Sequence, residues 1–200
     1  MSVLEKVRSS GKCPLSLLSI DSDMEFETMA VKVVDANELY LSYGPTVRVD
    51  FKKLLELTTS NNIENIYDNT GTDSILISRR AIILFLVAST PTANAILDTI
   101  LEDGYLSMVK LWLDDILKGT LGGIDLLLYL LTNITLLPVT KSIVKESGMG
   151  KAVGSIRKHR LCVDSPHKVA IIERVNAIKD AWHKSVKIRK DWVWVYQIVP

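Results

Sequence analysis

The feature that most constrains this chain is a series of short amphipathic helices marked by start and stop residues. From Asp50 onward, apolar residues recur at intervals of three and four positions, the spacing of one helix face. Thr90-Pro91 and Ser165-Pro166 each place a proline after a capping hydroxyl, and Gly104 and Gly119 are typical helix ends. About seven helices with short connections, and no alternation with strands, predict an all-α fold: a compact helical bundle of stacked helix pairs.

The expected helices begin at residues with short polar side chains. Asp50, Asp73, Thr90, Thr140 and Ser165 are predicted as N-caps. Each has a side-chain oxygen that can accept a hydrogen bond from a free backbone N–H of the first turn. Because the connections between these helices are short, we expect neighbouring helices to pack against each other.

Two of the expected helices stand out by their apolar residues. The segment from Ile124 to Leu137 contains Asp125 and Asn133 and ends at Pro138, so it is predicted as a buried core helix rather than a membrane span. The last helix keeps helical spacing at Val169, Ile172, Val175, Ile178, Trp182 and Val186.

The N-terminal quarter has a different pattern. Residues 26–50 contain short alternating runs broken at Asp35 and Gly44, which is typical of a β-hairpin or a strand-like arm. The sequence therefore predicts an N-terminal arm over residues 1–50, a helical domain over 51–190 and an aromatic C-terminal tail over 191–200.

Charge and cysteine content exclude several protein classes. The 24 Lys and Arg residues nearly balance 23 Asp and Glu, which disfavours a protein that coats nucleic acid. The two cysteines, Cys13 and Cys162, are far apart in sequence, so no disulfide scaffold is expected and a reducing compartment is favoured. The first residues lack the apolar run of a secretory signal.

The sequence lacks the residue patterns that catalysis or metal binding requires. Gly148-Met-Gly-Lys151 comes nearest to a phosphate-binding loop, but no Ser or Thr follows the lysine, so a helix end and a tight turn are favoured. His159, Cys162 and His167 lack the paired spacing of a structural zinc site. We expect no catalytic residue, no metal and no cofactor, and therefore a protein that is not an enzyme.

Two short motifs could bind another protein. The basic run Arg157-Lys-His-Arg160 is either a solvated helix end or one wall of a surface for an acidic, disordered peptide. Arg48-Val-Asp-Phe51 fits the pattern that adds a strand to protein phosphatase 1, although Val49 and Phe51 could equally enter the core.

The C-terminal half contains several motifs in a fixed order. Leu137-Pro-Val-Thr140 is a turn, Ser147 to Val153 contains a glycine-lysine step, Ile156-Arg-Lys-His159 is basic, and Trp182 lies on the last helix. Together they resemble the TFIIS N-terminal domain (LW domain) family, without a gap over the first 23 residues. The likeness covers roughly residues 75–188 and includes features of both the PNUTS-like and the IWS/Spn-like members.

The resemblance implies a non-catalytic docking platform of the RNA polymerase II elongation or termination machinery in the nucleus. Family members bind short linear motifs in disordered segments of elongation or chromatin factors. Trp182 matches the core tryptophan of the family, so we expect a structural role for it. By position, the residues implied in partner binding are Met149, Lys151, Arg157, Lys158 and His159.

These observations rank three functions. The first is a protein-interaction module of transcription that does no chemistry. The second is a regulatory subunit that brings protein phosphatase 1 to nuclear complexes through Arg48, Val49 and Phe51. The third, direct nucleic acid binding, is disfavoured by the near-neutral charge and by the lack of aromatic residues within the basic run.

Overall fold

The structure, a computed structural model, describes residues 3–18, 26, 30, 45–59, 69–90 and 95–196. Every regular element within these residues is helical, which confirms the predicted all-α class. In chain order the elements are α1 (Val3–Ser10), the 3-10 turn η1 (Leu15–Leu17), α4 (Pro45–Glu56), α5 (Asn69–Ser89), α6 (Ala95–Glu102), α7 (Tyr105–Lys118), α8 (Ile124–Ile134), α9 (Lys141–Glu146), α10 (Met149–Ser155), the 3-10 turn η4 (Ile156–Lys158), α11 (Arg160–Val163) and α12 (Lys168–Tyr196).

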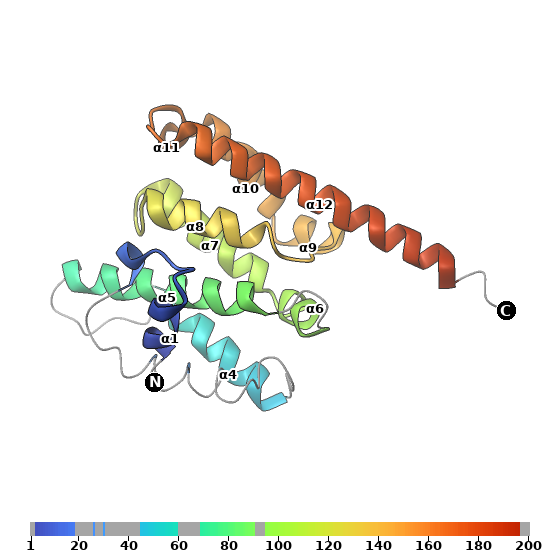
Figure 1. Ribbon diagram of the computed structural model, residues 1–200, viewed down its shortest axis with the longest axis horizontal. Helices are drawn as coiled ribbons and strands as arrows, with labels where there is room; N and C mark the ends of the chain where they lie inside the picture. The colour runs from blue at the N-terminus through green and yellow to red at the C-terminus, as the bar shows by residue number, and fades with distance from the viewer. Residues whose placement is uncertain are drawn as a thin grey trace.

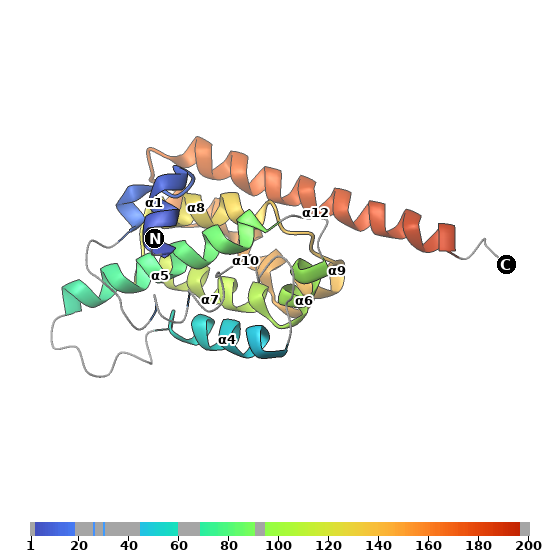
Figure 2. The ribbon, with the colours of Figure 1, turned by 60° about the horizontal axis from the view of Figure 1, so that its bottom comes forward.

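The helices stack in layers (Figure 1). α4 and α5 lie on one side of the molecule, α7 and α8 in the middle, and α12 on the other side. α8 contacts both α5 and α12, while α9 and α10 contact α7 and each other. Figure 2 shows that α12 follows the body along its first part and then extends beyond it. The long last helix therefore leaves the bundle next to α9 and α10.

α7 and α8 carry the centre of the hydrophobic core. α8 packs between α5 and α12, and this explains why it is buried on most sides although it is only 11 residues long. Among the residues that the structure describes, no helix is long and apolar enough to cross a membrane. The buried face of α7 consists of Tyr105, Leu106, Val109, Trp112, Leu113 and Ile116.

The described N-terminal residues belong to the same core. Val3 and Val7 of α1 and Leu17 of η1 are buried, and both elements pack against α5. The predicted strand segments, residues 31–34 and 39–43, lie outside the described residues. Residues 3–18 therefore form part of the bundle and not a separate arm.

The first helix after this region starts earlier than the sequence predicts. α4 begins at Pro45 and not after Asp50, so it crosses the predicted domain boundary between residues 50 and 51. Proline suits the first turn of a helix because its missing N–H would have no partner there. Pro45 is therefore a helix start and not a break between strands.

α5 also differs from its predicted bounds at both ends. It begins at Asn69, four residues before the predicted cap Asp73. At its other end, Thr90 does not cap the next helix, which starts at Ala95. The Thr90 hydroxyl instead donates a hydrogen bond to the Leu86 carbonyl oxygen at 3.0 Å and closes α5. A buried threonine can satisfy a free carbonyl at a helix end as well as a free N–H at a helix start.

The two C-terminal caps are confirmed. The Thr140 hydroxyl accepts a hydrogen bond from the Ile143 N–H at 3.2 Å, and the Ser165 hydroxyl accepts one from the His167 N–H at 3.0 Å just before α12. The packing face of α12 is shifted from the predicted one, because Val169 is exposed. The buried residues of its packing face are Ile171, Val175, Ile178 and Trp182.

A buried arginine joins three parts of the bundle. Arg80 of α5 is 1% exposed, and its guanidinium donates to the Thr58 carbonyl oxygen at 3.1 Å and to the Asp115 carboxylate at 2.7 Å. The guanidinium carbon also lies 5.8 Å from the Trp112 ring centroid. Burial lowers the pKa of Arg80, and the Asp115 carboxylate opposes that effect. The ion pair therefore ties α5 to α7 and to the turn after α4.

Removing the Asp115 carboxylate of the Arg80–Asp115 pair should destabilise the fold more than removing the neighbouring Asp114 carboxylate. We expect Asp115→Ala to lower the free energy of unfolding by about 2–3 kcal/mol, because a buried guanidinium would lose its charged partner. Asp114, which pairs with Lys110 on the outer side of α7, is the matched control, and Asp114→Ala should cost less than about 1 kcal/mol. Urea denaturation measures both, and equal losses would contradict the role given to Arg80.

Cys13 is a buried thiol. It is 4% exposed, and burial raises the pKa of Cys13 from its ordinary 9.0 to about 11, with a hydrogen bond from Tyr129 acting in the opposite direction. Between these two values the unfolded chain releases the thiol proton while the folded chain keeps it. The folded state then binds more protons than the unfolded state, so its stability falls as pH rises.

The difference in the Cys13 pKa between the folded and the unfolded chain predicts that the free energy of unfolding depends on pH in the alkaline range. From about pH 9 to about pH 10, the free energy of unfolding should fall by about 1 kcal/mol through Cys13 alone. Cys13→Ala should have a flatter dependence over the same range, whatever its absolute stability. Urea denaturation of both proteins at several pH values tests this, and parallel slopes would contradict it.

Candidate functional site

A groove of about 810 Å³ lies where α12 leaves the body of the molecule. α9 and α10 form one side of it and α12 forms the other, so residues some 40 positions apart in sequence meet there. Its lining consists of Lys141, Val144, Lys145, Gly148, Gly150, Lys151, Val153, Lys179, Trp182 and His183.

Two glycines allow α9 and α10 to pack closely at this groove. Gly148 has a φ of 70°, which lets the chain reverse between the two helices. The Ser147 hydroxyl accepts a hydrogen bond from the Met149 N–H at 3.3 Å and supports the same turn. A side chain at Gly150 would bring its Cβ to 3.1 Å from a Val144 methyl group. The glycine-lysine step therefore places Lys151 beside the residues of α9.

The walls of the groove are cationic. Lys141 and Lys145 lie one turn apart on α9, as do Lys179 and His183 on α12, and Lys151 adds a charge from α10. Among the described residues, no carboxylate lines the groove. Within the described part of the chain, none of these lysines forms a salt bridge. Their charges are therefore available to an acidic ligand.

The base of the groove is apolar. Val153 and Trp182 belong to the hydrophobic core and reach the groove with one edge, and Val144 is half-buried beside them. Trp182 is 8% exposed, which confirms its predicted core position. Its indole N–H is buried and has no hydrogen-bond partner among the described residues. An apolar base between cationic walls suits a peptide with an apolar anchor beside acidic residues.

The structure brings only one of the predicted partner-binding residues to this groove. Lys151 is exposed and lines it. Met149 is fully buried and packs in the core, so its predicted surface contact with a partner is wrong. Its place at the start of α10, directly after the Gly148 turn, points it into the bundle. The motif from Ser147 to Val153 thus contains both core residues and residues that line the groove, and the sequence alone did not distinguish the two kinds.

The basic run lies outside the groove. The chain changes from α10 to the 3-10 turn η4 at the buried Ile156, so Arg157 and Lys158 do not continue the groove wall. The Arg157 guanidinium donates to the Asn176 side-chain oxygen on α12. The His159 imidazole accepts a hydrogen bond from the Leu161 N–H at 3.3 Å and caps α11. Arg157 and His159 thus have structural partners, and the cationic walls come from other residues.

The phosphatase-docking motif is not available as a strand. Residues Arg48 to Phe51 lie within α4, and Phe51 is 1% exposed with its ring centroid 6.3 Å from that of Tyr105. A motif that docks by strand addition needs an extended backbone and a free aromatic side chain. In the folded chain this motif is helical and its Phe51 is buried, so phosphatase docking through these residues would require α4 to open first.

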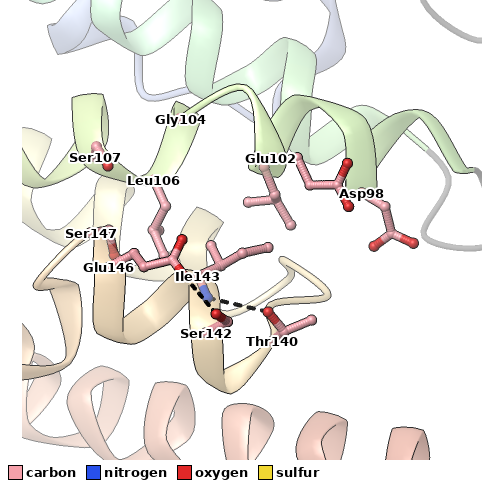
Figure 3. A pocket seen from close by; sticks show the side chains of 11 residues that line it. Asp98, Glu102, Gly104, Leu106, Ser107, Thr140, Ser142, Ile143, Glu146 and Ser147 are labelled. Atoms are coloured by element: carbon pink, nitrogen blue, oxygen red, sulfur yellow. Dashed lines mark hydrogen bonds between the residues drawn. The ribbon is translucent and has the colours of Figure 1, made fainter. Parts of the chain in front are cut away.

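A second depression of about 310 Å³ lies on the opposite side of α9 (Figure 3). Asp98 and Glu102 of α6 face Glu146 of α9 across it. Leu101, Leu106 and Ile143 supply its apolar surface, and the Glu146 carboxylate accepts a hydrogen bond from the Ser142 hydroxyl at 2.6 Å. This acidic pocket is thus opposite in charge to the groove.

Sequence reasoning missed most of the groove lining. Lys141 and Lys145, like Lys179 and His183, are spaced four apart on predicted helices, and this spacing was a usable signal. What the sequence did not contain was the position of α12 across the groove from α9. Among the described residues no group of three or more His, Cys, Asp and Glu residues could hold a metal ion.

Comparisons with known proteins show a likeness over this region. Residues 130–186, which include the whole groove, match the family of TFIIS helical bundle-like domains. Transcription factor SPN1 of Saccharomyces cerevisiae is 29% identical over 110 residues, covering 51% of this chain and 27% of that protein. Transcription factor IWS1 of Eremothecium gossypii is 31% identical over 84 residues, covering 42% of this chain and 23% of that protein. The chain spans about a quarter of the length of these curated relatives. No solved structure matches it.

Adjacent residues at the groove should differ sharply in their effect on stability. We expect Trp182→Ala to lower the free energy of unfolding by about 3–5 kcal/mol, because it leaves a cavity in the core. His183 is exposed, so His183→Ala should change stability by less than about 0.5 kcal/mol. Thermal and urea denaturation measure both, and a small loss for Trp182→Ala would contradict its place in the core.

Proposed function

We propose that the protein is a non-catalytic interaction module of the transcription machinery, because its residues 130–186 match the family of TFIIS helical bundle-like domains. It acts in the nucleus, in elongation or termination by RNA polymerase II. Its ligand is a short linear motif in a disordered segment of an elongation or chromatin factor, and that motif binds in the lysine-lined groove.

The observation that carries this proposal is the composition of the groove. Four lysines and an apolar base, with no carboxylate among the described lining residues, complement a peptide that carries an aromatic or Leu anchor beside Asp or Glu. The groove lies between helices that are fixed by the core, since Val153 and Trp182 are both buried. A rigid site of this kind loses little entropy on binding, and this suits capture of a disordered segment.

The relatives support the cellular setting. Both are named as transcription factors. The stretch that matches SPN1 covers about half of this chain. The near-neutral charge and the absence of a recognisable catalytic motif fit a docking role better than nucleic acid coating or chemistry. Phosphatase targeting has no remaining support, because its motif is helical and its Phe51 is buried.

The test reverses two charges on opposite walls of the groove. Lys145→Glu combined with Lys179→Glu should abolish capture of transcription factors from nuclear extract, because acidic motifs would meet like charges. Lys12→Glu combined with Lys118→Glu is the matched control, since both lysines are exposed, lie outside the groove and give the same change in net charge. Quantitative mass spectrometry of the captured proteins compares the two.

Stability separates a lost interaction from a lost fold. Lys145 is exposed and Lys179 is half-buried, and no described residue forms a salt bridge with either of them. The double reversal should therefore change the free energy of unfolding by less than about 1 kcal/mol. Equal capture by the groove variant and its control would contradict the proposed function.

A further inference from the structure

Two hydroxyl residues of the chain are followed directly by a proline, and their surroundings in the structure differ. They belong to the pairs Thr90-Pro91 and Ser165-Pro166. We propose that Ser165 is a phosphorylation site for a proline-directed protein kinase, and that Arg160 and the start of α12 hold the phosphate. This inference does not depend on the groove, because Ser165 precedes the first groove residue of α12 by about 20 Å along the helix axis.

The segment around Ser165 is open to a kinase. It lies between α11 and α12, at the opposite end of α12 from the part that extends beyond the body (Figure 1). From Val163 to Ala170 no residue is buried, whereas Cys162 and Ile171 on either side are fully buried. The residues that join the two helices belong to neither of them. A short exposed segment between two buried anchors can open without disturbing the core.

The hydroxyl groups of Ser165 and Thr90 differ in their availability. The Ser165 oxygen accepts a hydrogen bond from the His167 N–H at 3.0 Å, and its proton has no acceptor among the described residues. Thr90 is 3% exposed, and its hydroxyl donates to the Leu86 carbonyl oxygen at 3.0 Å. A kinase would have to open the end of α5 to reach Thr90. Of the two candidates in the sequence, the fold therefore leaves Ser165 accessible.

The residues that follow Ser165 suit this class of kinase. Proline has no backbone N–H, so an apolar wall of the kinase at that position leaves no donor unsatisfied. Lys168, three positions after the serine, is exposed and forms no salt bridge with a described residue. Kinases of the cyclin-dependent class select a hydroxyl followed by proline and, in the third position, by a basic residue. Thr90 lacks this arrangement, because Ala93 occupies its third position.

A cation lies beside Ser165 and can hold a phosphate there. Arg160, the last residue of the basic run, lines a depression of about 380 Å³ together with Ser165. It is exposed, and within the described part of the chain its guanidinium forms no salt bridge. A guanidinium can bind a phosphate through two parallel hydrogen bonds. The basic run, which the groove does not use, therefore has a ligand within its own surface once Ser165 is modified.

The other groups around Ser165 act in both directions. The first turn of α12 favours negative charge through its free N–H groups. His167 and Lys168 are exposed and add positive charge when protonated. Asp164 lines the same depression and repels a phosphate. The balance favours the dianion, because one carboxylate opposes an arginine, a lysine and the helix start.

The reaction is a phosphoryl transfer from ATP. The Ser165 Oγ attacks the γ-phosphorus, and the new Oγ–P bond forms as the bond between the γ-phosphorus and the bridging oxygen of ADP breaks. The hydroxyl proton passes to the catalytic base of the kinase. The side chain thereby gains about two negative charges at neutral pH.

Mapping the phosphate by quantitative mass spectrometry tests the site. The whole folded chain is incubated with a purified cyclin-dependent kinase, its cyclin, Mg²⁺ and ATP. We expect Ser165 to carry the phosphate and Thr90 to carry at least about 20-fold less, because the fold hides its hydroxyl. Lys168→Gln should slow the reaction about tenfold. Lys158→Gln is the matched control, because Lys158 is exposed but lies outside the recognised positions, and it should leave the rate unchanged.

Two synthetic peptides, covering residues 158–172 and 85–98, separate the ways in which the site can fail. If the peptide with Ser165 is modified but the folded chain is not, the segment is closed in the protein and the inference is wrong. If neither is modified, the residues after Ser165 are not recognised and it is equally wrong. Modification of Thr90 as fast as Ser165 in the folded chain would also overturn it.

The role of Arg160 is tested by ³¹P NMR titration of the modified chain. The second pKa of phosphoserine is about 6. We expect it to be about 0.5 lower in the folded chain than in the phosphorylated peptide 158–172, which carries the same charges without the fold. Arg160→Gln should remove at least about half of that difference, and Lys158→Gln should not. Equal pKa values in the chain and the peptide would show that the fold does not hold the phosphate.

Discussion

The buried guanidinium of Arg80 is the interaction on which the arrangement of the helices depends. A charge that is 1% exposed is tolerated only because Asp115, the Thr58 carbonyl and the Trp112 ring surround it. These partners come from α7 and from the turn that follows α4. The Trp112 indole also donates to the Thr58 hydroxyl at 3.1 Å, so the same contacts fix the central tryptophan of α7.

Once α7 is fixed, the position of the groove follows from packing. α7 contacts α8, α9 and α10, and α8 contacts α12 along its buried face. The two sides of the groove are thus held by neighbouring helices of one core and not by loops. The same α9 that supplies one groove wall also supplies one wall of the acidic pocket. A helix of six residues therefore contributes charged side chains to both depressions.

Local sequence signals predicted best where one residue decides a helix end. Thr140 and Ser165 accept the expected backbone hydrogen bonds. Gly104 and Gly119 have the positive φ values of 94° and 74° that suit a helix end. Asp50 failed as a cap because Pro45 starts the helix earlier, and Thr90 failed because its hydroxyl bonds backward to α5. A residue of this type can accept a hydrogen bond at the start of one helix or donate one at the end of another, and the packing of the surrounding helices decides between these roles.

The sequence by itself determined the helical class, several helix ends and the likeness of residues 130–186 to TFIIS helical bundle-like domains, because periodicity, caps and motif order are local properties. Tertiary structure alone decided which cations form a site. Arg157 and Lys158 were the conspicuous basic residues, yet the groove uses Lys141, Lys145 and Lys179 together with Lys151. The physical reason is that a binding surface depends on which helix faces lie opposite each other. The positions of α9 and α12 are set by their contacts with α7, α8 and α10, and not by the charged side chains themselves.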